Sequence, residues 1–266
     1  MDPDDHDLEL LRWDSEHFGW PVGRIRVDDL APDRLRAGLG AARRLGLRLV
    51  YCFRDEGHPL GDALLEEFHG SRLSTQVTFA RSLPTAEPAA APEGVRIERL
   101  SGTGSLAELA PIALEVGRHS RFNVDPSIPR PAFESLYRKW LENSLRGEIA
   151  DAVFAARAGA GALVGFVSLT LRPPWPARIG LVGVGEPARR AGVATALVAR
   201  ALAAMGDAGA PRVEVSTQRE NPEACRFYGA RGFREVRTRI AYHFWPGRAG
   251  AGDARRKPPA EAEGRR

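Results

Sequence analysis

Apolar positions in the first 81 residues change repeatedly between the spacing of strands and that of helices. Short apolar runs predict strands at residues 24–27, 47–53 and 76–81. Apolar residues at intervals of three and four predict helices at residues 32–45 and 60–68. The pattern therefore predicts a small N-terminal α/β domain over residues 1–81.

The same alternation returns after residue 94 and continues over a longer stretch. The predicted strands lie at residues 95–100, 152–157, 163–171, 179–184 and 212–217, with a strand pair over 233–244. The predicted helices lie at residues 105–116, 133–145, 191–205 and 222–230. The turn at residues 158–162 is typical of a hairpin, and the proline-containing segment 119–132 is typical of a loop. A second, larger α/β domain is expected over residues 95–245.

Two segments lack the large apolar residues that a core requires. Residues 82–94 place Pro84, Pro88 and Pro92 among small residues, which is typical of an extended linker. Residues 246–266 are rich in Gly, Ala and Arg, and this composition predicts a disordered C-terminal tail.

The charge of the chain is concentrated in that tail. The net charge is +4, and residues 247–266 hold six basic and three acidic side chains. The remainder of the chain is nearly neutral, so the sequence gives no reason to expect a nucleic-acid partner. The acidic N-terminus lacks the positive charge of a signal peptide, and Arg200 interrupts the longest apolar run. We expect a cytoplasmic protein with no membrane partner.

Cysteine and histidine give no sign of a metal centre. Cys52 and Cys225 are far apart, and none of the six His residues has the spacing of metal ligands. No Gly-x-Ser-x-Gly motif indicates a serine nucleophile either. We therefore expect no metal cofactor and no covalent acyl-enzyme.

The first candidate binding segment lies between a predicted strand, ending near Val184, and a predicted helix. Unpaired N–H groups in the first turn of a helix favour anions, and small residues let a ligand approach the backbone closely. The segment that combines these features with two positive charges is Arg189, Arg190, Ala191, Gly192, Val193 and Ala194. It suits a pyrophosphate; a solvated basic helix start is the alternative interpretation.

The same segment contains a weak dinucleotide-binding pattern. Gly183-Val-Gly185-Glu-Pro-Ala188 lies between a strand and a helix, and Asp207 follows at about the spacing of a ribose-binding carboxylate. The pattern occurs late in the chain and after a hairpin. A nicotinamide-dependent oxidoreductase is therefore kept as an alternative.

A second candidate segment follows the predicted strand 212–217. Its helix would place Ala224, Phe227, Tyr228 and Arg231 on one face, where Tyr228 could simply be a core aromatic. Together the two segments resemble the acetyl-CoA-binding core of the GNAT superfamily of acetyltransferases. That core combines Arg/Gln-x-x-Gly-x-Gly/Ala with a later Asn, a small residue, a Tyr and Gly-Phe. The matching residues are Arg189, Gly192, Ala194, Asn221, Ala224, Tyr228, Gly232 and Phe233.

The resemblance implies an acyltransferase with a central mixed sheet, flanking helices and acetyl-CoA as co-substrate. It implies that the strand 179–184 diverges from the next one, so that backbone groups of Val182 and Val184 pair with pantetheine. Residues 189–194 would hold the pyrophosphate, Asn221 would bind near the pantetheine arm, and Tyr228 would be the general acid.

Further stretches resemble one subfamily, the dTDP-fucosamine acetyltransferases of polysaccharide biosynthesis. They are Trp13, Phe18-Gly19, Ser120-Arg121-Phe122, Trp140-Leu-Glu-Asn143, Arg146-Gly147, Val167-Ser-Leu169 and Ile179-Gly-Leu181. This resemblance implies that the acceptor is the 4-amino group of a dTDP-amino sugar, with Arg121 and Phe122 at the substrate. Residues 123–129 depart from the subfamily pattern.

Two further alternatives remain. The acceptor could instead be an amine of a protein, a peptide or another small molecule. A non-catalytic CoA-binding module is the third reading, although such a module would have no need of Tyr228. The sequence leaves the oligomeric state open, a homodimer included.

Overall fold

The chain forms two compact units. The computed structural model describes residues 7–26, 30–83, 91–159 and 161–247. The first unit combines residues 1–72 with 242–266, and the second comprises residues 73–241. Most of the expected linker and tail, residues 84–90 and 248–266, lies outside the described residues.

These boundaries differ from the expected domains 1–81 and 95–245. Strand β4 (Gly70–Ser82) forms an antiparallel ladder with β9 (Arg212–Gln218), from Gln76 paired with Gln218 to Ser82 paired with Arg212. Most of β4 therefore belongs to the second unit, although it precedes the expected linker. At the other end, Pro246 is buried and its carbonyl accepts a hydrogen bond from Arg43 Nε at 2.8 Å. The first residue of the expected tail is thus part of the first unit.

The first unit is built on a parallel β–α–β arrangement. Its elements are β1 (Leu8–Leu10), α1 (Arg12–Phe18), β2 (Val22–Ile25), α2 (Pro32–Arg44), β3 (Leu49–Asp55) and α3 (Asp62–Glu67). Strand β2 is antiparallel to β1 and parallel to β3. Helix α2 begins with a proline and buries Leu35 and Leu39. The small α/β unit predicted from the sequence is present, and the short elements β1 and α1 were not predicted.

The second unit contains the remaining elements, except that β10 ends in the first unit from Tyr242 onwards. After β4 they are β5 (Val95–Leu100), α4 (Leu106–Val116), α5 (Arg121–Val124), α6 (Arg130–Leu145), β6 (Ala152–Ala158), β7 (Ala162–Thr170), β8 (Ala177–Val184), α7 (Val193–Asp207), β9, α8 (Pro222–Gly229) and β10 (Arg234–Phe244). Short 3₁₀ turns occupy Thr103–Ser105, Gly117–His119 and Glu186–Ala188. The strand pair expected over residues 233–244 is a single strand, β10.

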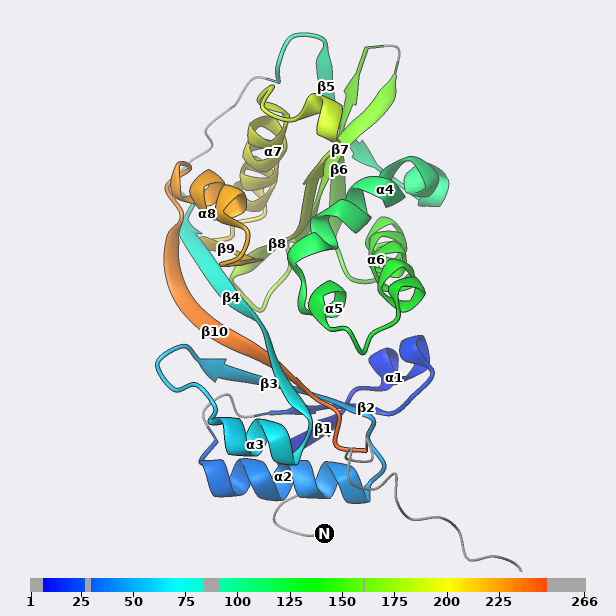
Figure 1. The fold of residues 1–266 in the computed structure, drawn as a ribbon. Helices are drawn as coiled ribbons and strands as arrows, with labels where there is room; N and C mark the ends of the chain where they lie inside the picture. Colours follow the sequence, from blue (N-terminus) through cyan, green and yellow to red (C-terminus); the bar gives the residue numbers. More distant parts are fainter. Residues whose placement is uncertain (1–6, 27–29, 84–90, 160, 248–266) are drawn as a thin grey trace, which may run out of the picture. The chain divides into compact units, whose positions relative to one another are not determined.

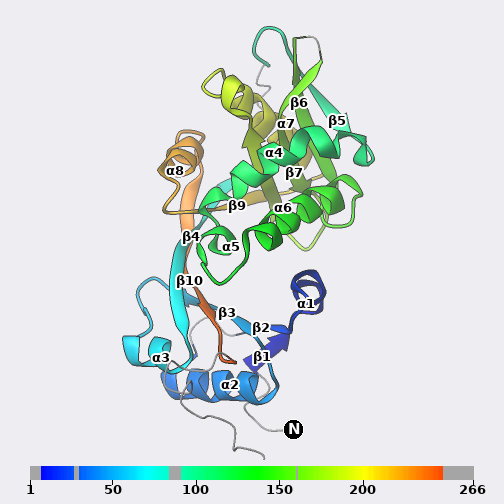
Figure 2. The same cartoon turned by 45° about the vertical axis from the view of Figure 1, so that its right-hand side comes forward.

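The sheet of the second unit is mixed, as predicted. Its strand order is β10-β4-β9-β8-β7-β6-β5. Strands β5 to β8 form an antiparallel meander, whereas β8 and β9 are parallel. Helices α4 and α6 cover one face of the sheet and α7 covers the other (Figures 1 and 2). A cluster of buried apolar side chains lies on each face.

Strands β8 and β9 pair along only part of their length. The parallel ladder joins Ala177 with Val213, Arg178 with Glu214 and Ile179 with Val215, and it ends there. On the other side, β8 stays paired with β7 as far as Val184, through an irregularity opposite Ser168. The backbone groups of β8 that face β9 are therefore left without a strand partner after Ile179.

Helix α4 approaches the backbone of β8 at Gly183. A methyl group added to Gly183 would lie 2.6 Å from Ile112 Cγ2 and 2.7 Å from Val116 Cγ2, both on α4. Only glycine permits this contact without moving the helix. Gly206 in α7 provides a contrast, because a methyl group there would meet nothing within 4 Å.

We predict opposite effects of alanine at these two glycines. Gly183→Ala should lower the free energy of unfolding by about 1–3 kcal/mol through overpacking. Gly206→Ala should raise it by about 0.5–1 kcal/mol through helix propensity. Urea unfolding of both variants measures the two effects, and a Gly183→Ala protein as stable as the wild type would contradict the close approach of α4.

Candidate functional site

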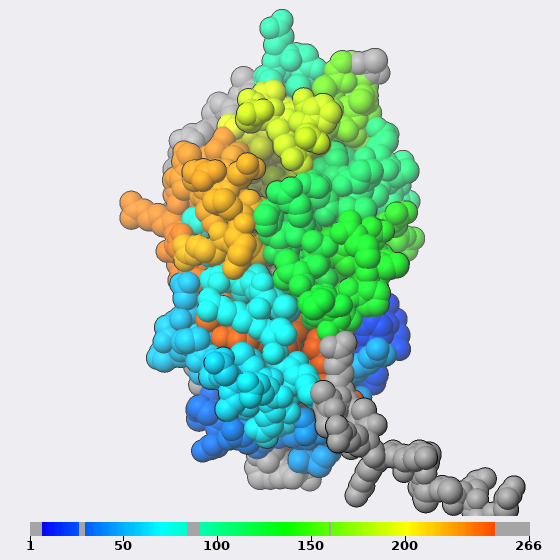
Figure 3. All heavy atoms as spheres, in the orientation of Figure 1, coloured from blue at the N-terminus to red at the C-terminus, as the bar shows by residue number. Residues whose placement is uncertain are grey.

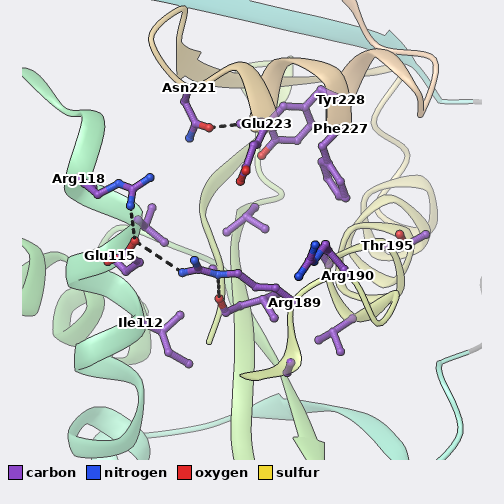
Figure 4. Close-up of a pocket in the computed structure, with 18 of the residues that line it drawn as sticks. Ile112, Glu115, Arg118, Arg189, Arg190, Thr195, Asn221, Glu223, Phe227 and Tyr228 are labelled. Carbon is purple, nitrogen blue, oxygen red and sulfur yellow. Dashed lines mark hydrogen bonds and ion pairs between the residues drawn. The ribbon is translucent and has the colours of Figure 1, made fainter. Parts of the chain in front are cut away.

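The divergence of β8 from β9 opens a cleft of about 540 Å³ within the second unit. Its walls come from β8, α4, the segment after β8, the first turn of α7, and α8. In Figure 3 the atoms of α4 in green, the segment before α7 in yellow and α8 in orange surround its mouth. Figure 4 shows the side chains that line it.

The floor of the cleft is the unpaired edge of β8. Gly185 donates its N–H to Val164 O on the β7 side, at 2.8 Å. Because successive residues of a strand alternate in direction, the backbone groups of Val184 and Val182 face the opposite side. Both residues line the cleft. This edge can accept an extended ligand as an added half-strand.

One end of the cleft is a concave stretch of backbone before α7. Arg190 and Gly192 both have left-handed backbone conformations, with φ of 61° and 83°. Helix α7 begins at the next residue, Val193, and the N–H groups of its first turn have no partner within the helix. Such alternating backbone conformations beside a helix N-terminus form an anion-binding concavity. Arg189, Arg190, Gly192, Val193 and Ala194 line the cleft, whereas Ala191 does not.

Arg189 reaches across the cleft although its side chain is 39% exposed. Its Nε donates a hydrogen bond to Val184 O at 3.1 Å, and its guanidinium lies 3.6 Å from the carboxylate of Glu115. Glu115 also pairs with Arg118 at 3.3 Å (Figure 4). Arg189 therefore engages one of the two backbone positions of β8 that were expected to receive a ligand.

Asn221 has a structural role in addition to its place in the cleft. Its Oδ1 accepts the N–H of Ala224 at 3.1 Å and caps the N-terminus of α8. The side-chain oxygen is therefore already hydrogen-bonded to the backbone of α8, and Asn221 also lines the cleft (Figure 4). The amide nitrogen is the group that can donate to a ligand.

Tyr228 is a core aromatic whose hydroxyl reaches the cleft. The residue is 6% exposed, and its ring contacts the rings of Phe79, Phe227 and Phe233. The hydroxyl points into the cleft in Figure 4, and no hydrogen bond joins it to any described residue. Burial raises the pKa of Tyr228 well above its usual value of 10.0. At neutral pH the group is therefore a phenol that can donate a proton or a hydrogen bond.

Sequence reasoning missed several charged residues of the cleft. Glu115, Arg118 and His119 come from the end of α4 and the turn after it, and Glu223 from α8. Arg231 follows α8, where its guanidinium stacks on Phe227 at 3.6 Å and donates to Thr195 Oγ1. Burial lowers the pKa of Arg231. The helical spacing from Ala224 to Arg231 was the signal that could have identified Arg231.

The two expected substrate residues, Arg121 and Phe122, do not line the cleft. Phe122 is 1% exposed and its ring packs edge-on against Trp140, with 5.7 Å between the ring centroids. The Arg121 guanidinium lies over the Phe122 ring at 4.1 Å. The structure thus places Phe122 in the core of the second unit, because its short helix turns the ring inward.

The structure removes the basis of the dinucleotide-binding alternative. After Gly185 the chain forms a 3₁₀ turn, Glu186–Ala188, and α7 begins only at Val193. A pyrophosphate-binding glycine turn must lead directly into its helix. Asp207 is the last residue of α7 and does not follow a strand. Gly183 instead allows the contact with α4.

In the described residues no group of three or more His, Cys, Asp or Glu side chains could hold a metal ion. No helix in the described ranges is long and apolar enough to cross a membrane.

Comparisons with known proteins agree with this geometry. Residues 120–233 match the model of the acetyltransferase (GNAT) family. A GCN5-related N-acetyltransferase from Sphaerobacter thermophilus has a similar structure, with a TM-score of 0.60 and 17% identity over 89% of this chain and 75% of that one. A second, from Kribbella flavida, has a TM-score of 0.57 and 17% identity over 84% and 81%.

A tandem GNAT protein from the clavulanic acid biosynthesis pathway is also similar. Its TM-score is 0.56, with 17% identity over 87% of this chain and 77% of that one. At such identities the likeness of these structures shows the fold alone. Among curated proteins, none matches this chain.

We predict that substitutions can distinguish the two roles of the Asn221 side chain, whose oxygen caps α8 and whose amide nitrogen can donate to a ligand. Asn221→Ala removes the acceptor of the Ala224 N–H and should lower the free energy of unfolding by about 0.5–2 kcal/mol. Asn221→Asp retains an acceptor and should unfold at nearly the wild-type urea concentration. Equal destabilisation of the two variants would contradict the capping role.

Proposed function

We propose that the cleft binds acetyl-CoA and that the acetyl group passes directly to the 4-amino group of a dTDP-linked amino sugar. Residues 120–233 match the acetyltransferase (GNAT) family, and this match supports an acyltransferase activity. The observation that carries the donor half of this proposal is the separation of β8 from β9, which leaves a free backbone edge beside an anion-binding turn.

The groups in the cleft suit the parts of CoA. Its pantetheine arm carries amides, which can pair with the backbone of Val182 and Val184. Its pyrophosphate suits the N–H groups between Arg190 and the first turn of α7. The amide nitrogen of Asn221 is available to a pantetheine carbonyl because the oxygen is used by the cap. Asn221→Asp should therefore weaken CoA binding while keeping the fold.

The reaction forms a carbon–nitrogen bond and breaks the carbon–sulfur bond of the thioester. The acceptor amine must be neutral to attack, and its nitrogen loses one proton to solvent water as the amide forms. The departing sulfur becomes a thiolate, whose conjugate acid has a pKa of about 8.5, and it takes up one proton. Tyr228 contributes a protonated hydroxyl to the cleft, and this group can donate to the developing charge. Since its raised pKa makes it a weak acid, its hydrogen bond to sulfur matters most as charge develops.

The acceptor assignment rests on the resemblance of residues 13–19 and 120–122 to the dTDP-fucosamine acetyltransferases. Arg118 and His119 lie immediately before the second of these segments and line the cleft. They can face a phosphate-bearing acceptor even though Phe122 is buried. An amine of a protein, a peptide or another small molecule is the second candidate.

One experiment distinguishes these acceptors. The full chain is incubated with acetyl-CoA and, separately, with dTDP- and UDP-linked amino sugars, lysine peptides and small polyamines, and the products are analysed by mass spectrometry. The proposal expects an added acetyl group on a dTDP-4-amino sugar. If only peptides or polyamines were acetylated, the amino-sugar acceptor would be wrong and the acetyltransferase activity would stand.

We predict that Tyr228 acts in turnover more than in binding. Tyr228→Phe keeps the ring contacts and removes the proton donor, so kcat should fall by about 10²–10⁴-fold. The Kd of CoA should change little. Because the raised pKa keeps Tyr228 protonated below about pH 10, the pH profile of kcat should keep its shape. A Phe variant with full turnover would assign Tyr228 to packing alone.

We also predict that Glu115 restrains Arg189 before the donor binds. Glu115→Gln removes the charge that holds the guanidinium across β8, so CoA should bind about two- to fivefold more tightly. The gain in affinity should disappear in an Arg189→Gln background, because that variant has no guanidinium for Glu115 to hold. Weaker binding by Glu115→Gln, or a lower kcat at unchanged Kd, would contradict this role.

A further inference from the structure

One guanidinium in the cleft wall has no acidic partner. Arg231 follows α8 and lines the cleft, and its side chain is half-buried. Among the described residues the guanidinium donates to neutral acceptors alone, Phe227 O at 2.9 Å and Thr195 Oγ1. Its Nε is buried and has no hydrogen-bond partner in that part of the chain.

The other arginines of the cleft are compensated or solvated. Arg118 and Arg189 share the carboxylate of Glu115, at 3.3 and 3.6 Å, and Arg190 is exposed. A charge that is withdrawn from water without a counter-ion destabilises the fold. Arg231 combines partial burial with an uncompensated charge, so packing alone does not account for a cation at this position.

Arg231 is fixed relative to Tyr228 by the backbone and by ring contacts. Its N–H donates to Tyr228 O at 3.0 Å, and its own carbonyl accepts Arg81 Nη1 at 2.9 Å. Its guanidinium lies over the Phe227 ring at 3.6 Å. That ring packs edge-on against the ring of Tyr228, with 5.3 Å between the centroids (Figure 4). The charge and the Tyr228 hydroxyl therefore belong to one rigid group at the end of α8.

The two side chains also interact electrostatically. Burial raises the pKa of Tyr228, and the positive charge of Arg231 opposes that rise. Burial lowers the pKa of Arg231, and Tyr228 opposes that fall. The other charged or titratable side chains that line the cleft are Glu115, Arg118, His119, Arg189, Arg190 and Glu223. Arg231 is the cation of the cleft wall that acts on Tyr228.

We propose that Arg231 is a positioning residue for the chemical step, and that its uncompensated charge, acting through Tyr228, stabilises the negative charge on the departing sulfur. The inference rests on the proposed function, since it takes the thioester to lie beside the Tyr228 hydroxyl. As the carbon–sulfur bond breaks, its electron pair moves to sulfur, and the hydroxyl passes its proton there. The phenolate that remains is stabilised by the guanidinium until solvent water returns a proton.

The charge at sulfur can be measured without an acceptor. Titration calorimetry on the full chain compares the Kd of CoA with that of desulfo-CoA, which lacks the sulfur and cannot ionise there. A free thiol with a pKa of about 8.5 is mostly neutral at pH 7 and mostly thiolate at pH 9. If the thiolate is stabilised, the wild-type preference for CoA should grow about fivefold or more between these pH values, since a tenfold change corresponds to one pKa unit.

The variants assign this preference to the charge of Arg231. In Arg231→Gln and in Tyr228→Phe the growth with pH should stay below about twofold. Arg231→Lys keeps the charge and should retain most of it. Arg234→Gln changes an exposed arginine outside the cleft and should behave as the wild type. Titration of His119 or of Cys225 changes the affinity for both nucleotides alike and does not enter their ratio.

Turnover separates this role from donor binding. With an amine that the wild type acetylates, Arg231→Gln should lower kcat about tenfold and keep the Kd of CoA at pH 7 within about twofold. In a Tyr228→Phe background the same substitution should change kcat by less than about twofold, because the hydroxyl through which it acts is missing.

A preference for CoA that does not change with pH in the wild type, or that Arg231→Gln leaves unchanged, would overturn this role and leave the proposed function standing. A weaker Kd of CoA at unchanged kcat would mean that Arg231 contacts the donor, and would overturn it too. If urea unfolding shows that Arg231→Gln does not fold, the Tyr228→Phe and Arg231→Lys variants decide by the same ratio. A wild type that binds neither nucleotide would overturn both this role and the proposed function.

Discussion

The site depends on the unequal pairing of β8, which stays hydrogen-bonded to β7 along its length but to β9 only as far as Ile179. Opposite Ser168 the β7–β8 ladder becomes irregular, and the Ser168 hydroxyl accepts the N–H of Leu181 at 2.8 Å. Such an irregularity bends a strand and increases its twist. After Ile179, β8 therefore turns away from β9, and helix α4 packs against the bent part at Gly183. The free backbone edge and the cleft both follow from this bend.

The other elements of the site are positioned by the two strands that diverge. Strand β8 leads into the turn at residues 189–192 and α7, and β9 leads into α8, which is capped by Asn221 and carries Tyr228. Tyr228 is fixed by its ring contacts in the core, while its hydroxyl remains in the cleft. A buried ring thus orients the hydroxyl without a hydrogen bond from that hydroxyl to any described residue.

Local patterns in the sequence were sufficient to predict most helices and strands of the second unit. Apolar spacing predicted the helices and strands of the second unit, and the segments 189–194 and 221–233 are short enough for spacing to define them. What the sequence could not predict depends on contacts between distant residues. Because β4 pairs with β9, the boundary between the units lies earlier in the chain than expected. The Arg189–Glu115 ion pair joins elements far apart in the sequence. Phe122 packs on Trp140 and does not line the cleft.

Amide hydrogen exchange at Val182 and Val184, measured with and without CoA, tests the central claim most directly. The β8–β9 ladder ends at Ile179, so the N–H groups of Val182 and Val184 have no partner in β9, and we expect the donor to pair with them as an added half-strand. CoA should then slow exchange at these two amides and in the first turn of α7, and leave the β5–β6 ladder unchanged. Saturating CoA without protection of Val182 and Val184 would contradict the account.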